Sequence, residues 1–115
     1  MKLAIPTNNG KNVAEHFGRC EFYAILNEKG EALGQLENTS EHMGGAGLPP
    51  ELMKEHQINI LLCRDIGPKA LDLCQKLKIE VFTDQAATIE EIFLAWKNNK
   101  IRKPNKNNSC KQHSI

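Results

Sequence analysis

The chain of 115 residues is long enough for one domain, and its apolar share of 40% and charged share of 25% exclude a wholly disordered protein. No apolar run approaches the roughly 20 residues that span a bilayer, and no secretory signal is apparent, so we expect a cytoplasmic protein without membrane contact. The net charge of +1 is uneven, because residues 92–115 carry six Lys and Arg and no acid, against a net −5 before them.

The first third of the chain is predicted to be mostly strand. A short buried strand covers residues 2–6, where Pro6 is expected to end it, and turn-forming residues follow at 7–12. Residues 21–27 and 30–40 are typical of two strands in a hairpin with Gly30 at the turn. The early part of the chain therefore predicts antiparallel pairing.

The second half alternates helix and strand. Proline at a first turn and helical spacing of apolar residues predict helices at 49–57, 65–78 and 88–98, with strands at 58–63 and 79–83. Thr88 with Glu91 three residues later predicts a capping box on the last helix. Strands that alternate with helices are usually parallel, so we expect an α/β fold: a mixed five-stranded sheet with helices on both faces. We expect one domain at 1–101 and a basic, flexible tail at 102–115.

The hexapeptide Glu15–Cys20, "EHFGRC", follows the first strand, at the sheet edge where ligands of such folds bind. On a helical turn the side chains of His16 and Cys20 would face the same way and bind one soft or borderline metal ion or cluster. His42 would supply a third ligand, and Arg19 would balance the charge of an anionic cluster. The alternative is that His16 only caps a turn.

Glycines in two further segments are candidates for binding an anion through backbone N–H groups. Gly44, Gly45 and Gly47 precede a predicted helix, and Gly67 with Lys69 follows a predicted strand. The alternative is that these glycines only form turns.

The four cysteines contain no CxxC pair, and we expect them to be reduced. Cys63 ends an apolar strand and Cys74 lies on an apolar helix face, so both are expected in the core. The pair Cys110 and His113 falls in the basic tail and is interpreted as incidental. Cys20 with His16 as base is an alternative that would make the protein a thiol enzyme, but no third orienting residue can be placed.

A nucleic-acid module is not expected, because the sequence has no recognition motif of that kind.

Four segments, in this order and spacing, resemble the dinitrogenase iron-molybdenum cofactor biosynthesis family, which includes NifX-type carriers and the carboxy-terminal domain of NifB-type proteins. They are "MKLAIPTNNG", "VAEHFGRCEFYAIL", "GGAGLPPELMKEHQINILLCRDIGPKALDLCQKLKIEVF" and "ATIEEIFLAW". The "EHFGR" and "IGPKAL" motifs at their relative distance are the most specific pieces. The resemblance covers residues 1 to about 101.

The resemblance implies a ribonuclease H-like fold and a function in binding rather than catalysis. Members of the family hold or pass on iron-sulfur or molybdenum-containing clusters, which implies donor and acceptor proteins as partners. The family histidines fall on His16 and His42, whereas Cys20 stands where relatives often have a small residue. We therefore expect a cluster carrier; the alternative is a regulatory or interaction module of the same fold without a cluster. The oligomeric state is left open, and in a homodimer two sites could share one cluster.

Overall fold

The computed structural model describes residues 1–38 and 49–101, which form one sheet with helices against both of its faces. The elements in chain order are β1 (Lys2–Thr7), the short 3-10 turn η1 (Phe17–Arg19), β2 (Phe22–Asn27), β3 (Ala32–Glu37), α1 (Pro49–Glu55), β4 (Ile60–Cys63), α2 (Pro68–Lys76), β5 (Glu80–Thr83) and α3 (Ile89–Lys97). Each predicted strand and helix is present, with ends that differ by up to three residues.

The sheet is mixed and has the strand order β3-β2-β1-β4-β5. β1, β2 and β3 pair antiparallel, whereas β4 and β5 run parallel to β1. Gly30 has φ +86° at the turn of the β2–β3 hairpin, as its position predicted. The register of β2 with β3 shifts between Ile25 and Leu26, beside Gly34, which has φ +145°. The predicted mixed five-stranded sheet is confirmed.

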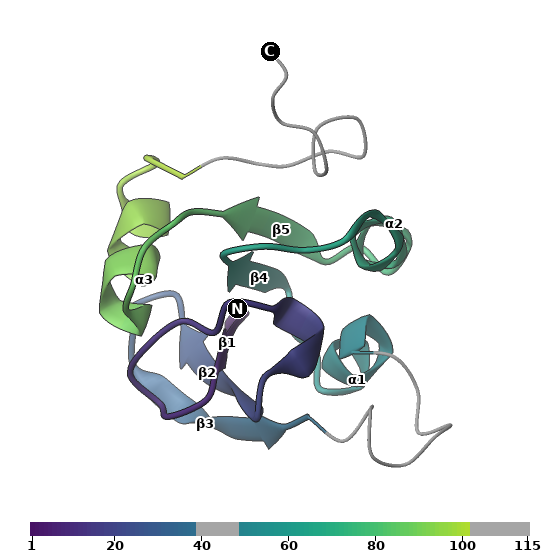
Figure 1. Ribbon diagram of the computed structural model, residues 1–115, viewed down its shortest axis with the longest axis horizontal. Coiled ribbons are helices and arrows are strands. Elements are labelled where there is room, and N and C mark those ends of the chain that lie inside the picture. The colour runs from purple at the N-terminus through teal and green to yellow at the C-terminus, as the bar shows by residue number, and fades with distance from the viewer. Residues whose placement is uncertain (39–48, 102–115) are drawn as a thin grey trace.

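The two faces of the sheet carry separate apolar cores, and alternate residues of β1 point into each. α1 and α2 cover one face, where Ala4 joins Tyr23, Met53, Leu71 and Cys74 in one buried cluster. α3 covers the opposite face, where Leu3 and Ile5 join a cluster with Leu62, Ile92 and Phe93 (Figure 1). The result is the three-layer, ribonuclease H-like α/β architecture that was expected.

The prediction that Pro6 ends the first strand is wrong. Pro6 lies inside β1, paired with Tyr23, and the strand continues to Thr7. On the other side of β1, pairing with β4 covers only Leu3 and Ala4, so at Pro6 no hydrogen bond to β4 is lost. The carbonyl of Pro6 instead accepts a hydrogen bond from the Ala14 N–H at 2.8 Å. This bond folds the following loop back against the strand.

The neighbouring parallel strands β1 and β4 bring two loops to the same edge of the sheet. The segment after β1 contains the "EHFGRC" turn, and the segment after β4 runs through residues 64–67 into α2. The chain passes from β1 to the antiparallel hairpin on one side and later to β4 on the other, so this is the edge at which the strand order reverses. None of the helices in the described part of the chain is long and apolar enough to cross a membrane.

Candidate functional site

A cavity of about 680 Å³ lies at this edge, on the face that α1 and α2 cover. Its walls come from the η1 turn, the first residues of α1, the loop after β4 and the first turn of α2. Four of the residues singled out in the sequence line it together: His16, Arg19, Gly67 and Lys69. These residues come from segments almost fifty positions apart, and the parallel pairing of β1 with β4 is what joins them.

The lining combines an apolar surface with a few charged groups. Phe17, Ile66 and Leu73 contribute apolar area, together with Pro49, Pro50 and Pro68. Arg19 and Lys69 are exposed cations, and Asp65 is the carboxylate among the described lining residues. The described lining of the cavity thus includes two basic side chains and one acidic side chain, a balance that favours a negatively charged ligand.

The turn that carries His16 and Cys20 differs from the expected one. The 3-10 turn spans only Phe17–Arg19, and the flanking residues His16 and Cys20 both have extended backbones. The His16 side chain is 59% exposed, whereas Cys20 is only 5% exposed and belongs to the core cluster. The expectation that both side chains face the same way is wrong, because an extended residue at each end of one short turn directs them apart.

Buried hydrogen bonds hold this turn in place. The Tyr23 hydroxyl donates to the Phe17 carbonyl at 3.0 Å, and the Cys20 thiol donates to the same oxygen at 3.5 Å. The amide of Asn38 donates to the Gly18 and Cys20 carbonyls at 3.1 and 2.9 Å. The sequence analysis did not single out Tyr23 or Asn38. Each lies in or just after a strand of the predicted hairpin, and nothing in that position indicates a hydrogen bond to the turn.

Burial has a chemical consequence for Cys20. The loss of solvent around its thiol raises the pKa of Cys20 above its usual value, although a hydrogen bond with Tyr23 works in the opposite direction. A raised pKa disfavours the thiolate, which is the nucleophilic and metal-binding form. The thiol-enzyme alternative is therefore disfavoured by the position of Cys20.

The N-terminus of α2 opens into the cavity without a side-chain cap. Gly67 is the N-cap residue and offers no side chain, and the first turn of the helix contains no acidic residue. Pro68 at the first helical position has no N–H, so the N–H groups that can face an anion at the positive end of the helix dipole are those of Lys69 and Ala70. α3 differs, because Thr88 and Glu91 form the predicted capping box there.

The remaining predicted site residues fall outside the part of the chain that the structure describes. His42, Gly44, Gly45 and Gly47 lie in residues 39–48, which lead directly into Pro49 at the cavity wall, and the tail residues Cys110 and His113 lie in 102–115. Within residues 1–38 and 49–101, no three His, Cys, Asp or Glu side chains are grouped closely enough to hold a metal ion. Cys63 and Cys74 are both fully buried, as expected for core residues.

The sheet order, the layers and the cavity at the reversal of strand order define a small α/β protein of ribonuclease H-like architecture with a cavity at the carboxyl ends of β1 and β4. The chain belongs to the family described as "Dinitrogenase iron-molybdenum cofactor", whose sequence profile matches residues 1–99. The family predicted from the sequence is thereby confirmed.

Individual relatives agree with this assignment. The uncharacterized protein MJ0580 of Methanocaldococcus jannaschii is 32% identical over 108 residues, which cover 90% of this chain and 91% of that protein. The apo form of the orange protein from Desulfovibrio gigas has a TM-score of 0.77 at 17% identity, over 90% of this chain and 92% of that one. A Thermotoga protein provisionally named as NifB has a TM-score of 0.71 at 19% identity, over 99% of this chain and 98% of that one. At these identities the two structures demonstrate the shared fold alone.

Proposed function

We propose that this protein binds and carries an iron-sulfur or molybdenum-containing cluster, or a precursor of one, as cargo in the cavity between the "EHFGRC" turn and α2. The observation that carries the proposal is the convergence of His16, Arg19, Gly67 and Lys69 on one cavity. Membership of a family concerned with the iron-molybdenum cofactor supports the same class of cargo. The role is non-catalytic, with one protein as donor of the cluster and another as acceptor.

The chemistry of the lining suits cargo that is held and then released. Clusters with sulfide or oxide ligands are anionic, so Arg19, Lys69 and the uncapped α2 N-terminus would attract them, and the apolar walls would exclude water. The imidazole of His16 would supply a direct ligand, and His42 a second. Few direct ligands and several ionic contacts permit transfer more readily than a closed four-cysteine cage.

Cys20 has a conditional place in this proposal. Its thiol donates to the Phe17 carbonyl beneath the turn and does not line the cavity, so Cys20 would become a ligand only if the turn opens. A metal ion bound to the Cys20 sulfur would displace the thiol proton and so offset the effect of burial on the pKa of Cys20. Under this proposal His16 could bind the cargo in the folded protein as it stands, whereas Cys20 could bind only after a rearrangement of the turn.

The test is anaerobic reconstitution of the full chain with iron and sulfide, and separately with molybdate and sulfide, followed by desalting, metal analysis and absorption spectroscopy. We expect metal to be retained with charge-transfer absorption, and His16→Ala to reduce it. Arg19→Gln and Lys69→Gln should each weaken retention at least tenfold, since a lost charge-assisted contact costs roughly 1.5–3 kcal/mol.

Lys54→Gln is the matched control, because Lys54 is an exposed cation on α1 that does not line the cavity. Retention by this variant should equal that of the unaltered chain. Cys20→Ser should leave the initial absorption intact if the turn stays closed and diminish it if the turn opens. A chain that retains neither metal under all these conditions would refute the carrier proposal in favour of an interaction module.

A further inference from the structure

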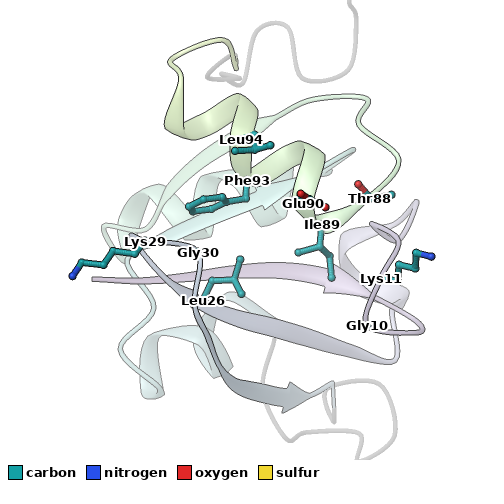
Figure 2. A pocket seen from close by; sticks show the side chains of 10 residues that line it. All are labelled: Gly10, Lys11, Leu26, Lys29, Gly30, Thr88, Ile89, Glu90, Phe93 and Leu94. Atoms are coloured by element: carbon teal, nitrogen blue, oxygen red, sulfur yellow. The ribbon is translucent and has the colours of Figure 1, made fainter.

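A second hollow lies on the opposite face of the sheet and shares none of its described lining residues with the cavity. This groove of about 530 Å³ runs between α3 and the β2–β3 turn and reaches the loop after β1. Figure 2 shows Leu26, Ile89 and Phe93 between the two ends of the groove, with Lys29 at one end and Lys11 at the other. Nothing in the proposed carrier function uses this groove.

A stripe of three exposed residues runs along α3 beside the groove: Glu90, Leu94 and Lys97. Leu94 is 46% exposed and, unlike the other exposed large apolar side chains of the described residues, Met1 and Leu33, it adjoins this groove. Spacings of four and three residues place the three side chains on one face of the helix. The Lys97 ammonium donates to the Glu28 carbonyl at 3.2 Å, so this side chain lies on the side of the β2–β3 turn.

The stripe is complementary to itself. When two copies of α3 pack antiparallel with their Leu94 side chains in contact, Glu90 lies four residues to one side of the symmetry axis and Lys97 three residues to the other. At about 1.5 Å per residue, each Glu90 then lies within about 2 Å, along the helix axis, of Lys97 of the partner subunit. Both residues are also on the groove side of Leu94, so a two-fold axis brings them to the same side of the pair.

We propose that the α3 stripe is the contact surface of a homodimer, in which α3 of a second copy packs antiparallel on Glu90, Leu94 and Lys97 and closes the groove. Two features favour a second copy over a different partner. The stripe presents one side chain of each sign, Glu90 and Lys97, at spacings that pair each with its opposite on a second copy, whereas a different partner would have to supply the same pattern. The contact is also isologous, which allows a closed dimer and no further growth.

The size of the surface sets the expected strength. A helix of nine residues is only about 14 Å long, so the contact lies at the small end of specific interfaces. We therefore expect a concentration-dependent dimer. Its ionic pairs are exposed, and salt should weaken it.

Sedimentation equilibrium of the full chain from about 1 μM to about 1 mM tests the proposal. We expect the mass to rise from 12.9 kDa toward twice that value. Glu90→Lys and Lys97→Glu should each weaken the dimer at least tenfold, because like charges then meet across the axis. The double variant Glu90→Lys with Lys97→Glu should recover the dimer, since the pair is restored with its signs exchanged. Leu94→Asp should abolish it.

Two matched controls locate the interface. Lys100→Glu makes the same charge change as Lys97→Glu at an exposed position beyond α3, and Leu33→Asp alters an equally exposed leucine on β3. Both should remain dimeric, and circular dichroism should show every variant folded. A monomer at all concentrations would overturn the proposal, as would a dimer that Leu33→Asp dissociates and Leu94→Asp does not, or a double variant that fails to recover. The experiment contains no metal, so its result is independent of the carrier proposal.

Discussion

Within the "EHFGRC" turn, adjacent residues have opposite environments. Phe17 and Cys20 are buried and bind the turn to the core, whereas His16 and Arg19 are exposed and border the cavity. The buried members give the exposed members a fixed position: Cys20 does so from outside the cavity, whereas Phe17 also contributes to its apolar wall. Asn38, which is 6% exposed, performs the same task from the end of β3 through two carbonyls of the turn.

Asn38→Ala tests the importance of that support. Removal of the amide leaves the Gly18 and Cys20 carbonyls without these two donors, so we expect the free energy of unfolding to fall by about 2 kcal/mol. Urea denaturation measures the loss. In the reconstitution experiment the same variant should retain less metal, because the turn that carries His16 and Arg19 is less ordered.

Tyr23→Phe is the graded comparison, since it removes the single hydroxyl that donates to the Phe17 carbonyl. The free energy of unfolding of this variant should fall by about 1 kcal/mol. Equal stability of Asn38→Ala and the unaltered chain would mean that the turn does not depend on these bonds.

At the scale of elements, two helices of equal length begin in different ways. α3 begins with the Thr88–Glu91 capping box, in which Glu91 also accepts from the Ala87 and Thr88 N–H groups at 3.0 and 3.2 Å. α2 begins at Gly67 with no side-chain cap, beside the cavity. The helix that lies away from the cavity is capped by its own side chains, and the helix that borders the cavity has no side-chain cap on its first turn.

Gly67→Asp tests whether that difference matters for function. Gly67 has φ −74° and a Cβ there would meet nothing within 4 Å, so the substitution fits. An aspartate N-cap should stabilise the protein by a few tenths of a kcal/mol, which thermal unfolding measures. The carboxylate would also occupy the N–H groups and repel an anion, so metal retention should fall at least tenfold.

Gly67→Ala is the control, because it fills the same space with neither cap nor charge. Metal retention by this variant should remain close to that of the unaltered chain. Undiminished retention by Gly67→Asp would show that the α2 N-terminus takes no part in binding.

At the scale of the whole molecule, three thiols are buried in the single core under α1 and α2: Cys20, Cys63 and Cys74. Loss of solvent raises the pKa of each of them, to about 12 for Cys74, from the usual value of 9.0. A raised pKa means that the folded protein keeps protons which the unfolded chain releases. The stability that these thiols contribute is complete below pH 9 and is lost as the pH rises toward the folded values.

We therefore expect the free energy of unfolding to fall between about pH 9 and pH 12, by up to about 1.4 kcal/mol per pH unit for each thiol. Urea denaturation at a series of pH values under reducing conditions measures the slope. Cys74→Ala should reduce the slope by the share of one thiol, which separates this effect from the titration of Tyr and Lys. An unchanged slope in Cys74→Ala would contradict this explanation.

Much of the fold was predictable because its signals are local. The apolar run at 58–63, the proline at the start of α2, Gly30 at the hairpin turn and the Thr88–Glu91 pair each act within a few residues. The ends were less predictable, since β4 begins at Ile60 only where it gains paired neighbours. The wrong prediction at Pro6 has the same cause. A proline is tolerated inside β1 because β4 does not pair with the strand at that position, and the sequence alone does not show where that pairing ends.

The sequence by itself determined the fold class, the family, and that His16, Arg19, Gly67 and Lys69 belong to loops at one edge of the sheet. Only the tertiary structure decided that Cys20 points into the core while His16 stays exposed, because burial depends on contacts with Tyr23 and Asn38, which lie on other segments. The α3 stripe is likewise a property of the tertiary structure. Glu90, Leu94 and Lys97 resemble any helix surface until the sheet buries the other side of α3 and leaves a groove beside them.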